Sequence, residues 1–160
     1  MLRRADHDLA AEAMRALDRI KEISPKGVVP NEVLTRVKGL PPLLRTSGVL
    51  PVLAFYAAKG GEGRPLDQAY AIVGSRLRMQ IVGVLGWTEQ GERSVDLAFL
   101  ERLTERMRDD PATGVRVAMR LEEFSGWLRR LGEALEKEQD RAESARKARG
   151  AGEQDGSADV

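Results

Sequence analysis

The segment over residues 39–59 (GLPPLLRTSGVLPVLAFYAAK) constrains the fold of this chain most strongly, because prolines and glycines divide its apolar residues into two short runs. Proline is tolerated in the first turn of an α-helix, and glycine often ends one. The sequence therefore predicts a short helix over 41–47, a joint at Gly48 and a second helix over about 49–59. The second helix is apolar on almost every side, which predicts a central core helix. A buried helical hairpin with no further role explains the same features.

Helical periodicity continues through most of the chain. Apolar residues recur every three to four positions, and no segment alternates apolar and polar residues as a strand does. Ser94 is the expected N-cap of the helix that follows it, and Asp110 with Pro111 is expected to cap the last helix. The remaining predicted helices span residues 2–23, 30–39, 65–85, about 97–107, and 111 onward.

These segments predict an all-α fold, a single-domain helical bundle of about five to six helices over residues 1–137. A chain of 160 residues can bury roughly two-thirds of its unfolded surface. After Leu135 large apolar residues vanish and charges of both signs alternate. We expect residues 138–160 to form a charged C-terminal extension, partly helical or disordered, with the helix reaching about Arg149 and a disordered tail from Gly150.

The last helix has two stripes on its surface. At about 100° per residue, six apolar side chains fall within roughly 80° of one another and predict its core face. They are Val117, Leu121, Phe124, Leu128, Leu131 and Leu135. A second stripe lies about 100° away and consists of Arg116, Arg120, Glu123, Trp127 and Arg130. This stripe fits a face toward phosphate or a neighbouring subunit, and it fits equally well a solvated surface with Trp127 at the core margin.

Charge is nearly balanced overall and locally positive. The formal net charge is +1, but between Arg36 and Arg78 seven basic residues stand against two acidic ones, a local excess of +5. The basic residues are Arg36, Lys38, Arg45, Lys59, Arg64, Arg76 and Arg78. Most basic residues of the chain are arginines, which bind phosphate through two hydrogen bonds. The codon usage of a GC-rich genome explains this arginine bias equally well.

Composition also limits the compartment. The chain has no cysteine, which removes disulfides and thiolate metal sites. No apolar run approaches the roughly eighteen residues of a membrane span, and the N-terminus carries acids instead of the apolar centre of a signal peptide. We expect a cytoplasmic protein with no membrane contact.

Residues for catalysis are scarce. His7 is the only histidine, so a Ser-His-Asp arrangement or a histidine metal site would depend on it alone. The adjacent acid pairs 109–110 and 122–123 diverge by about 100° on a helix and do not converge on one ion. The glycine-rich loop 59–64 follows a helix instead of a strand and lacks the ending of a phosphate-binding loop. We expect no enzyme activity, no metal and no cofactor.

Two blocks of sequence resemble a known family. The first runs from Leu40-Pro41 through the segment 45–49 to Leu53-Ala54-Phe55 and Lys59, and the second is Trp127-Leu128-Arg129-Arg130 with the following LGEA. Over roughly residues 5–137 the chain resembles the small α-helical subunit of type III-B CRISPR RNA-guided effector complexes, the Cmr complex. It departs from that pattern at Val49, at Pro51, at Val115-Arg116 and in the C-terminal extension.

The resemblance implies a non-catalytic subunit that stacks with neighbouring copies of itself along the guide–target duplex. Its implied partners are the other subunits of the effector complex and the guide and target RNA, whose backbone it would contact without reading sequence. The candidate RNA-binding residues are Lys38, Arg45, Lys59, Arg116, Arg120 and Arg130. Two alternatives stay open, the small subunit of the type III-A complex and a protein–protein helical scaffold without RNA contact. A metal-dependent nuclease would need several converging carboxylates.

Overall fold

The computed structural model describes residues 2–155, and the side chains of residues 5–152. Within this range the chain folds into seven α-helices without a strand, so the predicted all-α single domain is confirmed. The helices are α1 (Leu2–Ile23), α2 (Asn31–Lys38), α3 (Leu40–Ser47), α4 (Val49–Lys59), α5 (Pro65–Leu85), α6 (Leu97–Asp109) and α7 (Pro111–Asp155). This is one helix more than the five to six expected, although each of the seven corresponds to a segment that the sequence predicted as helical.

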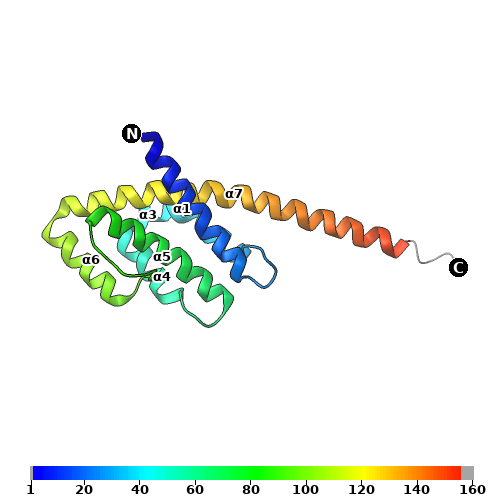
Figure 1. The fold of residues 1–160 in the computed structure, drawn as a ribbon, viewed down its shortest axis with the longest axis horizontal. Coiled ribbons are helices and arrows are strands. Elements are labelled where there is room, and N and C mark those ends of the chain that lie inside the picture. Colours follow the sequence, from blue (N-terminus) through cyan, green and yellow to red (C-terminus); the bar gives the residue numbers. More distant parts are fainter. Residues whose placement is uncertain (1, 156–160) are drawn as a thin grey trace.

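Helix α7 is the element on which the other six helices pack. It contacts each of the other six helices, lies along one side of the bundle and projects far beyond it (Figure 1). Val117, Leu121, Phe124 and Leu128 are completely buried against the other helices, which confirms the predicted core stripe. The apolar stripe of α7 therefore forms the wall on which the shorter helices pack.

Helix α4 is buried on one side and open on the other. Val52, Leu53 and Tyr56 are almost completely inaccessible, whereas Pro51 and Ala54 are exposed. Burial raises the pKa of the Tyr56 hydroxyl above its usual range. The expectation of a core helix is confirmed for this buried side, although α7 takes the central position that the sequence suggested for α4.

Gly48 is the joint between α3 and α4, as predicted. Its φ of 87° and ψ of 176° lie in a region that is open essentially only to glycine. Its N–H donates to the carbonyl of Leu44 at 3.0 Å and so closes α3, and α4 begins at the next residue. The sharp change of direction at this glycine allows two short helices to pack on the same long helix.

The connection between α5 and α6 is fastened to α5 by a buried arginine. Arg78 Nε donates to both carboxylate oxygens of Glu89 at 2.8 and 3.1 Å, and Arg78 Nη1 donates to the carbonyl oxygen of Ser94 at 2.8 Å. Ser94 is not the N-cap of α6, contrary to the sequence prediction. Asp96 fills that position, with its carboxylate accepting from the N–H of Phe99 at 2.8 Å. An aspartate caps a helix as well as a serine does, so residue type did not favour the predicted Ser94 over Asp96.

The start of α7 agrees with the prediction and its end does not. The carboxylate of Asp110 accepts from the Thr113 hydroxyl at 2.9 Å and from the Ala112 N–H at 3.2 Å, and these bonds lower the pKa of Asp110. The helix then continues through Gly150 to Asp155, beyond the expected end near Arg149. The division of the chain near residue 137 stays a prediction.

Candidate nucleic-acid interface

Three of the six predicted RNA-binding cations are already held by acceptors within the bundle. Lys38 at the end of α2 pairs with Glu136 of α7. Arg45 Nε of α3 donates to Glu122 Oε1 of α7 at 2.9 Å. The third, Arg120, donates from Nε to the Gln80 side chain of α5 at 2.9 Å. The first two contacts link α2 and α3 to α7 and offset part of the positive charge. The third links α7 to α5.

The other three predicted cations are exposed and form no ion pair among the side chains that the structure describes. Arg116 lies in the first turns of α7, and Arg130 carries its guanidinium over the Trp127 ring, 5.2 Å from the centroid. Lys59 ends α4, next to Asp67 of α5, whose pKa is lowered mainly by Arg64 and to a smaller extent by Lys59. These three side chains are free to meet an external anion.

An open groove of about 400 Å³ lies where α7 meets α1 and α3, and it brings Arg45 and Arg130 together beside Trp127. Three carboxylates line the same groove, those of Asp6, Glu122 and Glu123. Because acids outnumber the two guanidinium groups, the groove has no excess of positive charge to attract a phosphate. Phosphate contact is therefore expected from the exposed guanidinium groups at its rim.

The six cations do not share one continuous face. The carboxylate partners of Lys38 and Arg45 lie along the side of α7 that packs on α2 and α3, whereas Arg120 reaches toward α5. Lys59 belongs to the other end of α4, beside the loop that leads into α5. Arg116 and Arg130 remain on the second stripe of α7. The structure thus divides the predicted set into three cations with a side-chain acceptor in the bundle, two of them paired with a carboxylate, and three without one among the described side chains.

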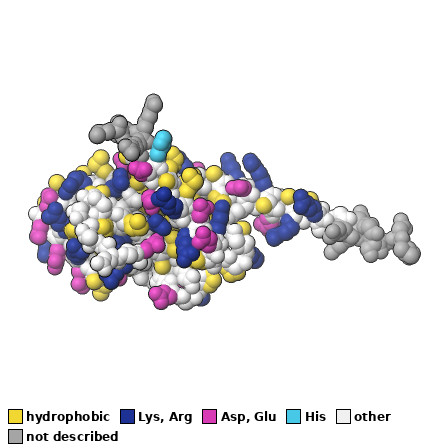
Figure 2. All heavy atoms as spheres, viewed as in Figure 1, with side chains coloured by type: hydrophobic (Ala, Val, Ile, Leu, Met, Phe, Trp, Pro, Cys, Tyr) yellow, Lys and Arg dark blue, Asp and Glu magenta, His cyan; other side chains and the backbone are white. Residues whose placement is uncertain are grey.

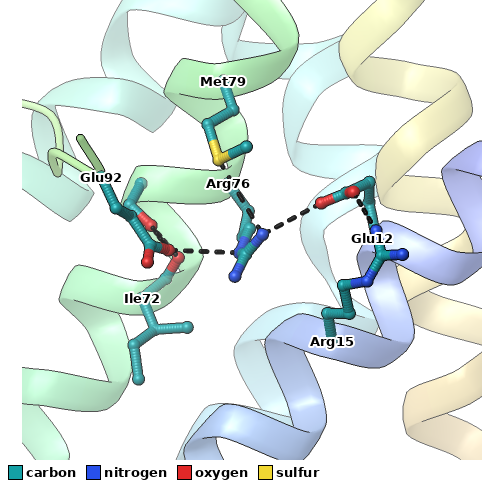
Figure 3. A network of polar contacts seen from close by, with 7 residues as sticks. Glu12, Arg15, Ile72, Arg76, Met79 and Glu92 are labelled. Atoms are coloured by element: carbon teal, nitrogen blue, oxygen red, sulfur yellow. Dashed lines mark hydrogen bonds and ion pairs between the residues drawn. The ribbon is translucent and has the colours of Figure 1, made fainter. Parts of the chain in front are cut away.

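The local excess of +5 counted over residues 36–78 does not become a positive surface. Arg76 of α5 pairs with Glu12 of α1 at 3.0 Å and with Glu92 at 3.3 Å, so that it links three parts of the fold (Figure 3). Arg78 is buried beside Glu89. On the face shown in Figure 2, basic and acidic side chains are intermixed over the bundle. Counting charges along the sequence overlooked pairings that the tertiary fold creates.

The two other arginines of that region are also engaged. Arg64 pairs with Asp67 three residues later, at 3.1 Å. Arg36 lies over the ring of Phe55, 4.8 Å from its centroid. The charge of Arg64 is therefore offset by an acid, whereas Arg36 is exposed and keeps its charge beside the aromatic ring.

The described part of the chain offers little for catalysis. No group of three or more histidine or acidic side chains within it is arranged to hold a metal ion. His7 is exposed on α1. Among the described residues no helix is long and apolar enough to cross a membrane.

A second group of cations, which was not predicted from the sequence, lies on α7 beyond the bundle. Arg141, Arg146, Lys147 and Arg149 lie within nine residues that contain one acid, Glu143. A charge count in a nine-residue window finds this group directly. It was missed because the whole extension over residues 138–160, counted together, has six acidic residues against four basic ones and so no positive excess.

Comparison with known proteins identifies the fold and the family. A model of the CRISPR-associated protein family Cas_Cmr5 matches residues 10–135. The chain belongs to the Cmr5 family. This family comprises the small helical subunit of the type III-B Cmr complex, so the resemblance noted in the sequence is confirmed. Its members are generally non-catalytic.

A solved structure supports the fold of this Cmr5 family member. The crystal structure of a CRISPR-associated Cmr5 family protein from Thermus thermophilus is similar, with a TM-score of 0.51 and 23% sequence identity. The similarity covers 79% of this chain and 92% of that chain. No curated protein sequence matches the chain.

Proposed function

We propose that this Cmr5 family member is the non-catalytic small subunit of a type III-B RNA-guided complex, where it stacks along the guide–target duplex and binds the target-RNA backbone. The observation that carries the proposal is the family match over residues 10–135, which includes all six predicted cations. Because the matched family belongs to the Cmr complex, membership of a type III-A complex has no support from the comparison.

The arrangement of charge suits binding that does not depend on RNA sequence. Phosphate contacts position a protein on a nucleic acid without reading its bases. Lys59, Arg116 and Arg130 are anchored on helices and have no acidic partner among the described side chains, so they are available for such contacts. Arg130 is further oriented by the Trp127 ring beneath it. We expect these three to contribute more than Lys38, Arg45 and Arg120.

The test compares two triple variants in the assembled complex with its guide RNA. One variant is Lys59→Gln, Arg116→Gln, Arg130→Gln, and the other is Lys38→Gln, Arg45→Gln, Arg120→Gln. Both remove three positive charges, so long-range electrostatics change equally. The first variant is expected to weaken target-RNA binding more, and by the same factor for unrelated target sequences with matched guides. Unchanged binding by both variants contradicts RNA contact by the bundle.

A protein–protein scaffold is the second candidate, and an apolar surface favours it. Val115 and Met119 lie one turn apart on α7 with 61% and 57% of their surface exposed. Exposed apolar side chains of this size are suited to a subunit contact. In this case Val115→Ser with Met119→Ser prevents incorporation into the complex, whereas the cation variants assemble normally and bind RNA as the wild-type complex does.

A further inference from the structure

Helix α7 runs about twenty residues past the part of the chain that matches the family. The match ends at residue 135, and the helix ends at Asp155. Figure 1 shows this extension projecting away from the bundle. Its base is fastened, because the Gln139 side chain accepts a hydrogen bond from Val29 N–H at 2.9 Å and donates one to Val29 C=O at 3.1 Å. The bundle therefore fixes the direction in which the extension leaves.

The projecting segment 141–149 carries an uncompensated positive charge. It contains four cations and a single acid, Glu143, which pairs with Lys147 at 2.9 Å. That pairing lowers the pKa of Glu143. Arg141, Arg146 and Arg149 form no ion pair among the described side chains, and every residue of the segment is exposed. Lys and Arg atoms are visible along the projecting part of α7 in Figure 2.

The composition of the segment favours a polyanion over a protein partner. Protein interfaces depend on a few buried aromatic or large aliphatic side chains. The segment has none, since its other residues are alanine and serine. Three of its four cations are arginines, whose planar guanidinium group matches phosphate oxygens. At about 100° per residue the cations point to several sides of the helix, which suits a flexible phosphodiester strand more than a flat surface.

We propose that segment 141–149 is a second RNA-backbone contact that binds single-stranded RNA without reading its sequence. The inference takes RNA as the ligand from the proposed function, but it uses none of the residues assigned there. Of the three exposed cations of the predicted set, Lys59 lies on α4, and Arg116 and Arg130 lie fourteen residues apart on α7, whereas segment 141–149 carries four within less than three helical turns. Segment 141–149 therefore has the highest local excess of positive charge along the described sequence.

The test measures binding of a short, fluorescein-labelled single-stranded RNA of mixed sequence to the full chain by anisotropy. The variant is Arg141→Gln, Arg146→Gln, Arg149→Gln, in which glutamine keeps the helix propensity of arginine. At about 50 mM salt the dissociation constant is expected to rise at least tenfold, and the slope of log K against log salt is expected to flatten by about 2, the value for three lost phosphate contacts. The charge-conserving variant with lysine at all three positions is expected to bind nearly as the wild type does.

The matched control removes three exposed arginines elsewhere, Arg19→Gln, Arg106→Gln and Arg108→Gln, and is expected to leave binding within about threefold of the wild type. Equal losses in both triple variants overturn the proposal, as does a wild-type chain that binds no RNA at low salt. If poly-glutamate displaces the labelled RNA as well as unlabelled RNA does, the segment binds an acidic protein. If the wild-type chain self-assembles and the triple variant does not, the segment is a contact between subunits. Either result also overturns the proposal.

The two proposals fail separately. Suppose that the extension variant loses RNA binding in this assay and that the complexes with the bundle variants still bind target RNA. This pattern supports the extension and contradicts the bundle assignment. The reverse pattern supports the bundle and contradicts the extension.

Discussion

Gln139 and Val29 hold each other by two hydrogen bonds across 110 residues of sequence. Val29 is 1% exposed with Gln139 in place, and removal of the glutamine side chain leaves its N–H and C=O without their protein partner. Gln139→Ala is expected to destabilise the protein by about 1–3 kcal/mol, the usual cost of an unpaired buried polar group. The Val29 amide is expected to exchange its hydrogen faster, which NMR-detected hydrogen exchange measures.

Gln139→Glu provides the graded control. Its carboxylate still accepts from the Val29 N–H but cannot donate to the carbonyl oxygen, so an intermediate loss is expected. Unchanged protection of the Val29 amide in Gln139→Ala would show that the extension is not fastened at this point.

The Arg78–Glu89 pair predicts a pH dependence of stability. The hydrogen bond from Arg78 is the main cause that lowers the pKa of Glu89, so the charged pair stabilises the fold above the unfolded-state pKa of a glutamate. This stabilisation is lost as the pH falls through the lowered pKa. Glu89→Gln is expected to cost about 2 kcal/mol at neutral pH, since hydrogen bonds to charged groups contribute on this scale. Denaturant unfolding at neutral pH and at acid pH measures the difference.

The difference between Glu89→Gln and the wild type is expected to shrink toward acid pH. Glu105 of α6 is exposed and forms no ion pair among the described residues, so Glu105→Gln serves as the control and is expected to change little. A constant difference across the pH range would be at odds with stabilisation by the charged pair.

Two glycines are expected to respond in opposite ways to alanine. Gly48 has a positive φ of 87°, so Gly48→Ala is expected to destabilise the protein by about 1–3 kcal/mol through backbone strain. Gly83 lies within α5 with open space where a Cβ would be added, so Gly83→Ala is expected to stabilise the protein by about 0.5–1 kcal/mol. Thermal unfolding of the two variants measures both effects, and changes of the same sign would contradict this account.

Local signals in the sequence were sufficient for most of the fold. The spacing of Val117, Leu121 and Leu128 predicted the face of α7 that is completely buried, because helical periodicity is a short-range property. Gly48 was predicted as a joint for a similar reason, since only the local backbone decides where a glycine is needed. The family resemblance rested on residues within these same segments.

Long-range pairings could not be predicted. Arg76 and Arg78 were counted in the local positive excess, but they meet Glu12, Glu92 and Glu89 only after α1 and the α5–α6 connection have packed on α5. Their burial is a property of the tertiary fold. The same holds for Lys38 and Arg45, whose carboxylate partners lie about a hundred and about eighty residues away on α7.

The central claim is that this Cmr5 family member supplies fixed positive charge to an RNA backbone and performs no bond breaking. The most direct measurement compares target-RNA affinity and target-RNA cleavage for the complex assembled with and without the chain, using two unrelated guide–target pairs between low and moderate salt. Without the chain, affinity is expected to fall by a similar factor for both targets, with a shallower salt dependence and with cleavage of saturating bound RNA retained. A loss confined to one target, or a loss of cleavage with unchanged binding, would contradict the claim.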